Sequence, residues 1–426
     1  MKEALSKLWS AYRKYGFARF ASRLLAWLRA NVLDCLSPAV LLYPQRCRAV
    51  IEEMLAGDYA RVLLWRSSFG YASPLFQRPQ HMAHALSRQR CLVIYEVTTA
   101  TDGCAALRQI APGLWLFNFN NVLLRRMLAR ALERSSLPRY IQLYSTDWKL
   151  SARALGRYAK RGYGILYEYI DHLSPALSGT AALPRAITEK FDYAMAHREV
   201  TVAVTAERLR RDVLRRRGGE NLVFASNGVD TAFFRRFDRY SFEPDFLSIL
   251  ARGKPIVCYY GALACWFDYA LVKALAATGR YSVVLIGLKY DTSFDEQLPQ
   301  PVENLYFLGP RPYGVLKYYA REAAVLMIPF LINDITRATS PVKLFEYMAL
   351  GRPIVTTDMD ECRQYRSVLI AQDTADFLAQ VERALTLRDD TDYLTALDRD
   401  ARANDWSEKA AAIVEGLRAR EQGVKR

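Results

Sequence analysis

The sequence lacks the residue patterns of metal-binding, disulfide-stabilised and dinucleotide-binding proteins. Its seven cysteines form no CxxC pair and follow no regular spacing, so neither a structural zinc ion nor a disulfide framework is predicted. Only four histidines occur, and none belongs to an HExxH or similar ligand pattern. No GxGxxG follows any apolar run, which argues against an NAD-linked enzyme. We therefore expect no metal ion and no cofactor, in a protein of the reducing cytoplasm.

Long uncharged apolar runs are also absent. No stretch of about 18 such residues occurs, so no segment is predicted to span a bilayer. Charges recur through residues 13–29, which argues against a secretory signal. Hydrophobic residues nevertheless make up 51% of the chain and exclude a mostly disordered protein. The length of 426 residues is too great for one ordinary core and favours two domains.

Positive charge is abundant and unevenly distributed. The net charge of +15 indicates an anionic partner, and residues 1–48 hold seven of the excess charges, from nine Lys or Arg against two acidic residues. Wound as a helix, residues 17–29 separate an apolar side from a side that carries Arg19, Arg23 and Arg29. Such a helix is typical of an anionic membrane interface. The alternative is a helix that packs on the protein's own N-terminal domain.

Short apolar runs alternate with segments of helical periodicity from residue 60 onward, which predicts parallel sheets covered by helices. The runs form two series, 61–65, 91–95, 114–117, 140–144, 164–170 and 200–204, then 255–260, 281–286, 304–308, 324–329 and 353–357. We expect an α/β protein with two doubly wound, Rossmann-like domains that face a cleft. The predicted divisions are an N-terminal amphipathic helical segment at 1–55, a first Rossmann-like domain at 56–235, a second at 240–404 and a C-terminal helix at about 405–426.

The segment TSPVKLFEYMALG at residues 339–351 has the start and stop signals of a helix and a lysine placed to bind a ligand. Ser340 is a candidate N-cap, and a glycine closes the other end. Lys343 falls in the first turn, where the helix dipole is already positive, so a cation there is unfavourable unless an anion shares the site. Glu346 lies one turn further along the same face, at a distance that suits a ribose. The alternative is a surface lysine that pairs weakly with Glu346.

Several motifs in a fixed order resemble GT-B glycosyltransferases of the large group 1, family 4-like class, in the bacterial branch that includes teichuronic acid and exopolysaccharide enzymes. In the C-terminal half these are YYGAL (259–263) with WFD (266–268), LGPRPY (308–313), IPF (328–330) and SPVKLFEYMALGRPIVTTD (340–358). The N-terminal half adds FQRPQH (76–81), YEYIDH (167–172), TA (205–206) and SNGVD (226–230), and DWS (405–407) opens a final helix. The resemblance covers roughly residues 60–420. It implies that 56–235 is the acceptor-side domain, joined by the C-terminal helix at about 405–426, and that 240–404 is the donor-binding domain.

This resemblance implies transfer of a sugar from a nucleoside diphosphate sugar to a saccharide or a polyprenyl-diphosphate-linked saccharide, with retention of configuration and without a metal. Negative charge grows on the departing diphosphate and must be stabilised. The residues expected to bind the donor are Gly261, Arg311, Ser340, Lys343 and Glu346. Gly261 is a candidate for close approach of backbone to the diphosphate, or is an ordinary turn at a strand end. Ala338 stands where many relatives have a first glutamate, so sugar identity and stereochemistry stay open.

Residues on the acceptor side are expected in the N-terminal half. Asp171 and His172, with Lys343, are the candidate catalytic residues, because the first two end a strand and suit orientation or deprotonation of the attacking hydroxyl. Asp171 is alternatively a helix cap. Arg78 and His81 open the first helix of the domain, near where an acceptor phosphate would lie, although a histidine on a helix is often structural.

Other functions remain as alternatives. The arginines at 208, 210, 211 and 215–217 suggest a nucleic-acid-binding protein, but no recognised motif accompanies them, and we expect no nucleic acid as a partner. A nucleotide-sugar epimerase of the same fold is the nearest rival among enzymes. Asp358 and Asp360 form a DxD, which we interpret as a plain loop rather than a metal site. We expect a peripheral protein on the inner face of the cell membrane, bound to its anionic surface through residues 1–30.

Overall fold

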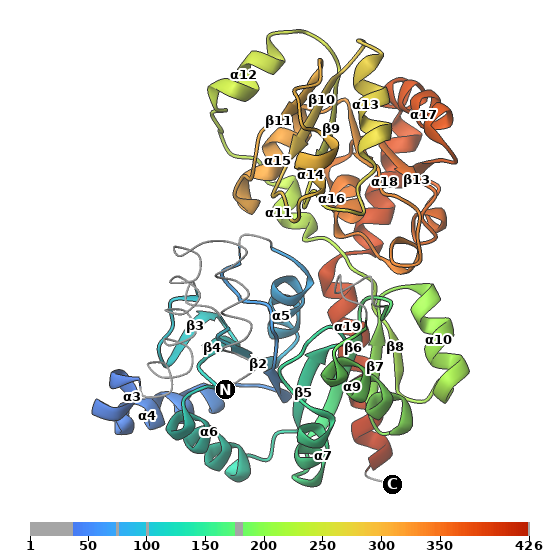
Figure 1. The fold of residues 1–426 in the computed structure, drawn as a ribbon. Helices are drawn as coiled ribbons and strands as arrows, with labels where there is room; N and C mark the ends of the chain where they lie inside the picture. The colour runs from blue at the N-terminus through green and yellow to red at the C-terminus, as the bar shows by residue number, and fades with distance from the viewer. Residues whose placement is uncertain (1–36, 74–75, 99–101, 175–181, 425–426) are drawn as a thin grey trace. The chain divides into compact units, whose positions relative to one another are not determined.

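The computed structural model describes residues 37–73, 76–98, 102–174 and 182–424. The chain divides into two compact units, which we name the first unit (residues 1–73 and 83–167) and the second unit (residues 74–82 and 168–426). Parallel strands flanked by helices make up most of the fold in Figure 1. The predicted amphipathic helix at residues 17–29 lies outside the described residues.

The strands form two sheets. The first has the order β3-β4-β2-β1-β5-β6-β7-β8 and the second has the order β11-β10-β9-β12-β13-β14. The first comprises β1 Arg61–Trp65, β2 Cys91–Glu96, β3 Leu107–Ala111, β4 Leu114–Phe117, β5 Arg139–Tyr144, β6 Gly164–Tyr169, β7 Thr201–Val204 and β8 Leu222–Phe224. The second comprises β9 Ile256–Tyr260, β10 Ser282–Ile286, β11 Leu305–Phe307, β12 Val325–Ile328, β13 Ile354–Thr357 and β14 Val368–Ala371.

Helices connect most of these strands. Those before β9 are α3 Pro38–Leu42, α4 Pro44–Leu55, α5 Arg78–Arg88, α6 Val122–Arg134, α7 Ala152–Lys160, α9 Arg185–Ala196, α10 Glu207–Arg217, α11 Thr231–Arg235 and α12 Pro244–Leu250. Those after β9 are α13 Tyr269–Ala277, α14 Ser293–Gln297, α15 Tyr313–Glu322, α16 Val342–Leu350, α17 Thr374–Thr386, α18 Thr391–Ala403 and α19 Trp406–Val424. Two short 3-10 helices, η3 Thr336–Ala338 and η4 Cys362–Gln364, interrupt the loops.

The second sheet has the doubly wound arrangement in full. Numbered from its own first strand, its order is 3-2-1-4-5-6, which reverses direction between β9 and β12. Strands β9, β10, β12 and β13 are buried along their whole length, as expected for a parallel sheet covered on both faces. Helices α13 and α17 contact each other, as do α15 and α16, which gives the sheet its two helical layers. Ligands in such sheets bind beyond the carboxyl ends of the strands at the reversal.

The predicted α/β class with two Rossmann-like sheets is confirmed, and most predicted strands agree with the observed ones to within a residue or two. Three strands were missed, namely β3, β8 and β14. The first of these is antiparallel to β4 and has no fully buried residue, so it shows none of the apolar character of a central strand. Two short helices, α11 and α12, lie between the last strand of the first sheet and the first strand of the second.

The start of α16 differs from the sequence prediction by one residue. Pro341 is the N-cap, and no side chain caps the helix. Ser340, predicted as the cap, instead has its side-chain oxygen 3.2 Å from the backbone nitrogen of Asn227, from which it accepts a hydrogen bond. The predicted stop is confirmed, because Gly351 is left-handed with φ of 62°. None of the described helices is long and apolar enough to cross a membrane.

Candidate functional site

Lys343 lies in the first turn of α16, which follows β12 at the point where the second sheet reverses direction. Its side chain is partly buried, and burial lowers the pKa of the ammonium, with the charge of Glu346 acting in the opposite direction. Within the described part of the chain the ammonium makes no hydrogen bond and no ion pair. A desolvated cation at the positive end of a helix, with no partner, is a site prepared for an anion.

Gly261 follows β9, the other strand at the reversal, and lies directly under Lys343. Its φ of 149° falls in the region that favours glycine, and a Cβ atom there would overlap the Lys343 side chain and the Tyr259 hydroxyl. Gly287, which follows β10, has a φ of 153°, and its Cβ atom would overlap the backbone of Gly261. These glycines let Lys343 lie over the end of β9. This explains why position 261 is a glycine, and it differs from both sequence interpretations, which were approach of the backbone to a diphosphate and an ordinary turn.

Glu346 occupies the same face of α16 one turn deeper and is only 3% exposed. Its two carboxylate oxygens accept hydrogen bonds from the hydroxyls of Tyr260 (2.8 Å) and Tyr313 (2.9 Å). Burial raises the pKa of Glu346, while Lys343 and the two hydroxyls oppose that rise. We expected this side chain to face the ligand openly. The structure instead buries it beneath two tyrosines, although each oxygen keeps acceptor capacity for a further donor.

The motif FQRPQH packs around Tyr313 rather than projecting toward an acceptor. The ring of Phe76 stacks on Tyr313 at a centroid distance of 5.0 Å. His81 contacts the same ring edge-on at 5.5 Å and stacks on Trp406 at 5.1 Å. His81 is therefore buried in an aromatic cluster, which differs from its predicted acceptor-side position.

Arg78 is also buried, with 3% exposure, instead of being open to an acceptor phosphate. Its guanidinium binds the Glu168 carboxylate through Nε (2.8 Å) and Nη2 (2.7 Å). Nη1 donates to the backbone carbonyl of Ser226 (3.0 Å) and to Oδ1 of Asn227 (3.3 Å). Asn227 in turn donates from Nδ2 to the carbonyl of Ser340 (2.6 Å), immediately before α16. Ser340 therefore attaches the start of α16 to Asn227.

Arg311, a predicted donor-binding residue, makes its contacts with other residues of the second unit. Its Nη2 forms an ion pair with Asp245 of α12 (2.6 Å), and its Nε donates to the Tyr319 hydroxyl (3.3 Å). Nη1 donates to the carbonyl of Leu308. The guanidinium is therefore held by α12 and α15, and the predicted contact with a diphosphate would require these bonds to break.

Asp171 and His172 follow β6 and are both partly exposed. Burial raises the pKa of Asp171 to about 6. Its carboxylate makes no hydrogen bond or ion pair in the part of the chain that the structure describes, so it caps no helix there. A carboxylate with a pKa near neutrality and no partner is suited to accept a proton.

The remaining charged motifs are accounted for by local ion pairs. Asp358 of the DxD pairs with Arg363, and Asp360 pairs with Arg337 (3.2 Å). No group of three or more His, Cys, Asp or Glu among the described residues could hold a metal ion. A cavity of about 200 Å³ near this loop is lined by Asp268, Phe330, Thr357 and neighbours, and Lys343 is not among its lining residues.

The arginine run of α10 is partly structural. Arg217 is buried and donates to the backbone carbonyls of Ala194 and Arg198, both at 2.7 Å. Arg215 and Arg216 both pair with Asp212. These contacts leave less free charge on α10 than the sequence indicated, which weakens the alternative of nucleic-acid binding.

Sequence reasoning identified Lys343, Glu346 and Gly261, which the structure brings together, but missed the groups that hold them. Tyr260 and Tyr313 lay within quoted motifs, yet nothing in their spacing showed that both hydroxyls would meet one carboxylate. Gly287 follows a predicted strand as Gly261 does, and that shared position was an available signal.

Comparison with known proteins places the site within a recognised family. Residues 254–387 match the sequence model of the family described as "Glycosyl transferases group 1". The matched segment is similar to a group 1 glycosyltransferase domain. It includes β9 to β14 and α16, so Gly261, Lys343 and Glu346 all lie within it.

A curated relative supports the same branch as the sequence resemblance, which is thereby confirmed. It is a Bacillus subtilis (strain 168) protein named as a teichuronic acid biosynthesis glycosyltransferase, TuaH, and it is 22% identical over 258 residues. The match covers 57% of this chain and 64% of the relative, so it spans less than two thirds of that protein's length.

Solved structures share the fold over most of the chain. Anabaena HepE in complex with UDP-glucose has a TM-score of 0.56 at 16% identity, covering 84% of this chain and 99% of its own. Sucrose-phosphate synthase from Thermosynechococcus elongatus has a TM-score of 0.55 at 14% identity, covering 86% and 100%. An E. coli trehalose-6-phosphate protein bound with UDP-2-fluoro glucose has a TM-score of 0.59 at 13% identity, covering 84% and 98%. At these identities the likeness concerns the fold alone.

Proposed function

We propose that this protein is a glycosyltransferase that moves a sugar from a nucleoside diphosphate sugar to a saccharide or lipid-linked saccharide in the synthesis of a bacterial-type surface polysaccharide. The observation that carries the proposal is the unpaired Lys343 ammonium at the start of α16, over Gly261 at the reversal of the second sheet. The group 1 domain and the UDP-sugar complexes among proteins of similar fold support a nucleotide-sugar donor.

Each site residue has a role in this proposal. Lys343 and the amino end of α16 stabilise the negative charge that grows on the departing diphosphate, in a reaction that needs no metal. Glu346, held by Tyr260 and Tyr313, accepts hydrogen bonds from the donor ribose through its remaining lone pairs. Asp171 orients or deprotonates the acceptor hydroxyl, with His172 beside it. We propose retention of configuration on the family resemblance.

A thermal-shift screen of nucleoside diphosphate sugars tests the proposal. The true donor at about 100-fold its Kd should stabilise the folded chain by about 2.7 kcal/mol. Lys343→Ala should abolish most of that shift and lower turnover by roughly 10²–10³-fold, as expected for loss of one group that stabilises a developing anion. The control is Lys273→Ala, which removes a lysine of α13 that donates to a backbone carbonyl. If Lys343→Ala and Lys273→Ala respond alike, the donor site is elsewhere.

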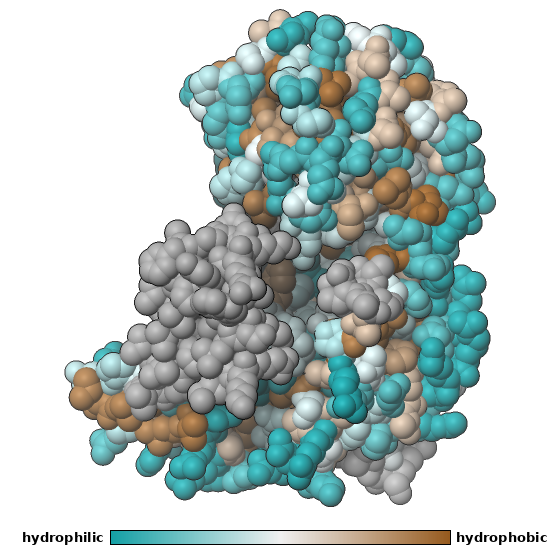
Figure 2. Space-filling view, in the orientation of Figure 1, coloured by the Kyte–Doolittle hydropathy of each residue, from teal (hydrophilic) through white to brown (hydrophobic). Residues whose placement is uncertain are grey.

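We also propose that the protein is peripheral on the inner face of the cell membrane. The predicted basic helix at residues 17–29 is outside the described residues, but the first unit adds an apolar surface of its own. Its members lie in or next to α3 and α6 and are between 37% and 71% exposed: Leu41, Leu42, Tyr43, Val122 and Leu123. Figure 2 shows apolar residues gathered where Figure 1 labels α3 and α4. Exposed arginines flank them at positions 46, 48, 125 and 126.

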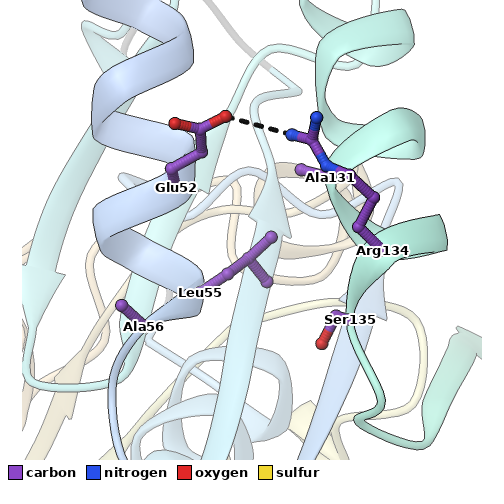
Figure 3. A pocket seen from close by; sticks show the side chains of 6 residues that line it. All are labelled: Glu52, Leu55, Ala56, Ala131, Arg134 and Ser135. Carbon is purple, nitrogen blue, oxygen red and sulfur yellow. Dashed lines mark hydrogen bonds and ion pairs between the residues drawn. The ribbon is translucent and has the colours of Figure 1, made fainter.

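The packing of α4 and α6 aligns the two parts of this surface. Glu52 of α4 accepts a hydrogen bond of 3.0 Å from Arg134 of α6, and a shallow cavity of about 380 Å³ lies beside the pair (Figure 3). Figure 3 shows α4 and α6 side by side and running in the same direction, so their amino ends, beside which the apolar residues and the arginines lie, point the same way. Apolar side chains among arginines suit an anionic bilayer surface.

A further inference from the structure

One chain of hydrogen bonds in the second unit connects the strand before Asp171 to the helix that carries Lys343. It begins at Glu168, which is fully buried in β6, accepts a hydrogen bond of 2.8 Å from Nε of Arg78 and forms an ion pair with its Nη2 at 2.7 Å. Arg78 holds the side-chain oxygen of Asn227 at 3.3 Å. The Asn227 amide nitrogen then holds the carbonyl of Ser340, two residues before α16 begins, at 2.6 Å.

The chemistry of Asn227 makes this chain directional. Its Oδ1 accepts from a cation, so its Nδ2 is left to donate, and the acceptor it meets is a backbone carbonyl. Its backbone nitrogen also donates to Ser340 Oγ at 3.2 Å, so two bonds fix Ser340. The N-cap residue of α16 makes no side-chain capping bond. The position of the first turn therefore depends on these two bonds from Asn227, which lies outside the helix.

We propose that Arg78 and Asn227 are positioning residues that set the first turn of α16, and with it Lys343, relative to the end of β6, where Asp171 follows three residues after Glu168. The inference rests on the proposed role of Lys343 toward the donor diphosphate. Sugar transfer needs the group that activates the hydroxyl and the group that stabilises the leaving diphosphate at a fixed spacing, and misplacement by about 1 Å can lower a rate by about 10²-fold.

A double-mutant cycle with Lys343 tests this. Asn227→Ala removes both ends of the amide contact, and we expect turnover to fall by about 10–100-fold and donor affinity to fall with it, because Lys343 is displaced. In a Lys343→Ala background the same change should have little further effect, because residues that act through one group are not additive. Arg78→Lys keeps the positive charge but loses the planar guanidinium that contacts Glu168 and Asn227 together. It should also lower turnover in the wild-type background and have little effect in the Lys343→Ala background. A merely structural role would lower stability without this dependence on Lys343.

Further variants keep the outcome clear. Asn227→Asp retains the contact with Arg78 but has no N–H for the Ser340 carbonyl, so it should lower turnover even where Asn227→Ala fails to fold. Thr231→Val is the matched control. Thr231 lies four residues after Asn227, and the change removes a hydrogen bond of similar length (2.7 Å) that its hydroxyl donates to Asp405. If Asn227→Ala lowers turnover by the same factor in the wild-type and Lys343→Ala backgrounds, the proposed positioning role is wrong. If Lys343→Ala itself has wild-type turnover, the proposed function fails first, and the two failures are distinguishable.

Discussion

At the scale of single residues, the two titratable groups that the proposed chemistry needs are both desolvated, and neither makes a hydrogen bond or ion pair with the residues that the structure describes. Burial disfavours the charged form of each, so the pKa of Lys343 is lowered and that of Asp171 is raised to about 6. Burying such charges destabilises a fold unless a ligand compensates. Two such groups in one unit therefore indicate a site that is completed by its substrates.

The Asp171 carboxylate should appear in the pH dependence of the reaction. A base must be deprotonated to act, so kcat/KM should fall as the pH drops below about 6, the pKa to which burial raises Asp171. Asp171→Asn should abolish this limb and lower the rate at pH 7.5, whereas His172→Gln should keep the limb. A pH–rate profile of each variant measures this, and an unchanged limb in Asp171→Asn would show that another group is the base.

The same substitution has an opposite effect on stability. A carboxyl whose folded pKa is raised binds protons better when folded, so its contribution makes the protein less stable as pH rises from about 4 to about 6. Asp171→Asn should therefore leave the chain at least as stable as wild type at neutral pH. Loss of activity together with loss of stability would indicate a structural role instead.

At the scale of elements, the site depends on how closely α16 can approach the end of β9. Gly261→Ala and Gly351→Ala form a matched pair, because both positions have positive φ but only the first has a neighbour in the way. Gly351→Ala should cost about 1 kcal/mol of stability and leave donor affinity unchanged. Gly261→Ala should also weaken donor binding by tenfold or more, since its Cβ displaces Lys343. Thermal unfolding and donor titration of both variants decide this.

The same elements show what the sequence could and could not predict. Strand positions in β9, β10 and β12 were found because a central parallel strand is apolar throughout. The donor helix was found because proline, lysine and glycine have positional meaning at helix ends. Contacts such as Arg78 with Glu168, which are 90 residues apart, leave no local pattern, so the buried positions of Arg78 and His81 were not predicted. The interaction of Arg311 with Asp245 was missed for the same reason.

At the scale of the whole molecule, the net charge of +15 and the apolar surface at α3 and α6 lead to a prediction about membranes. The full chain should bind vesicles that contain anionic lipid and bind neutral vesicles weakly, with binding that falls as salt screens the charges. Leu42→Glu with Leu123→Glu should reduce binding, and so should deletion of residues 1–30. Co-sedimentation with vesicles measures each.

Donor hydrolysis and a second pair of residues serve as controls for the vesicle experiment. Leu247→Glu with Leu331→Glu changes exposed leucines of the second unit and should leave vesicle binding unaltered. All variants should retain donor hydrolysis, because none of these residues lies in the donor site. Binding by the deletion and by the Leu42/Leu123 variant at the wild-type level would contradict the peripheral location.

The Asn227 contact also limits how this sequence can change over time. The side chain at position 227 must accept from a guanidinium and donate to a carbonyl at once, and an amide does so with an oxygen and a nitrogen held on one planar group. An ancestor that exchanged Arg78 for another residue would lose its anchor for Glu168 and for the 226–227 loop together. Positions 78, 168 and 227 are therefore expected to be inherited as a set, although long stretches of sequence separate them.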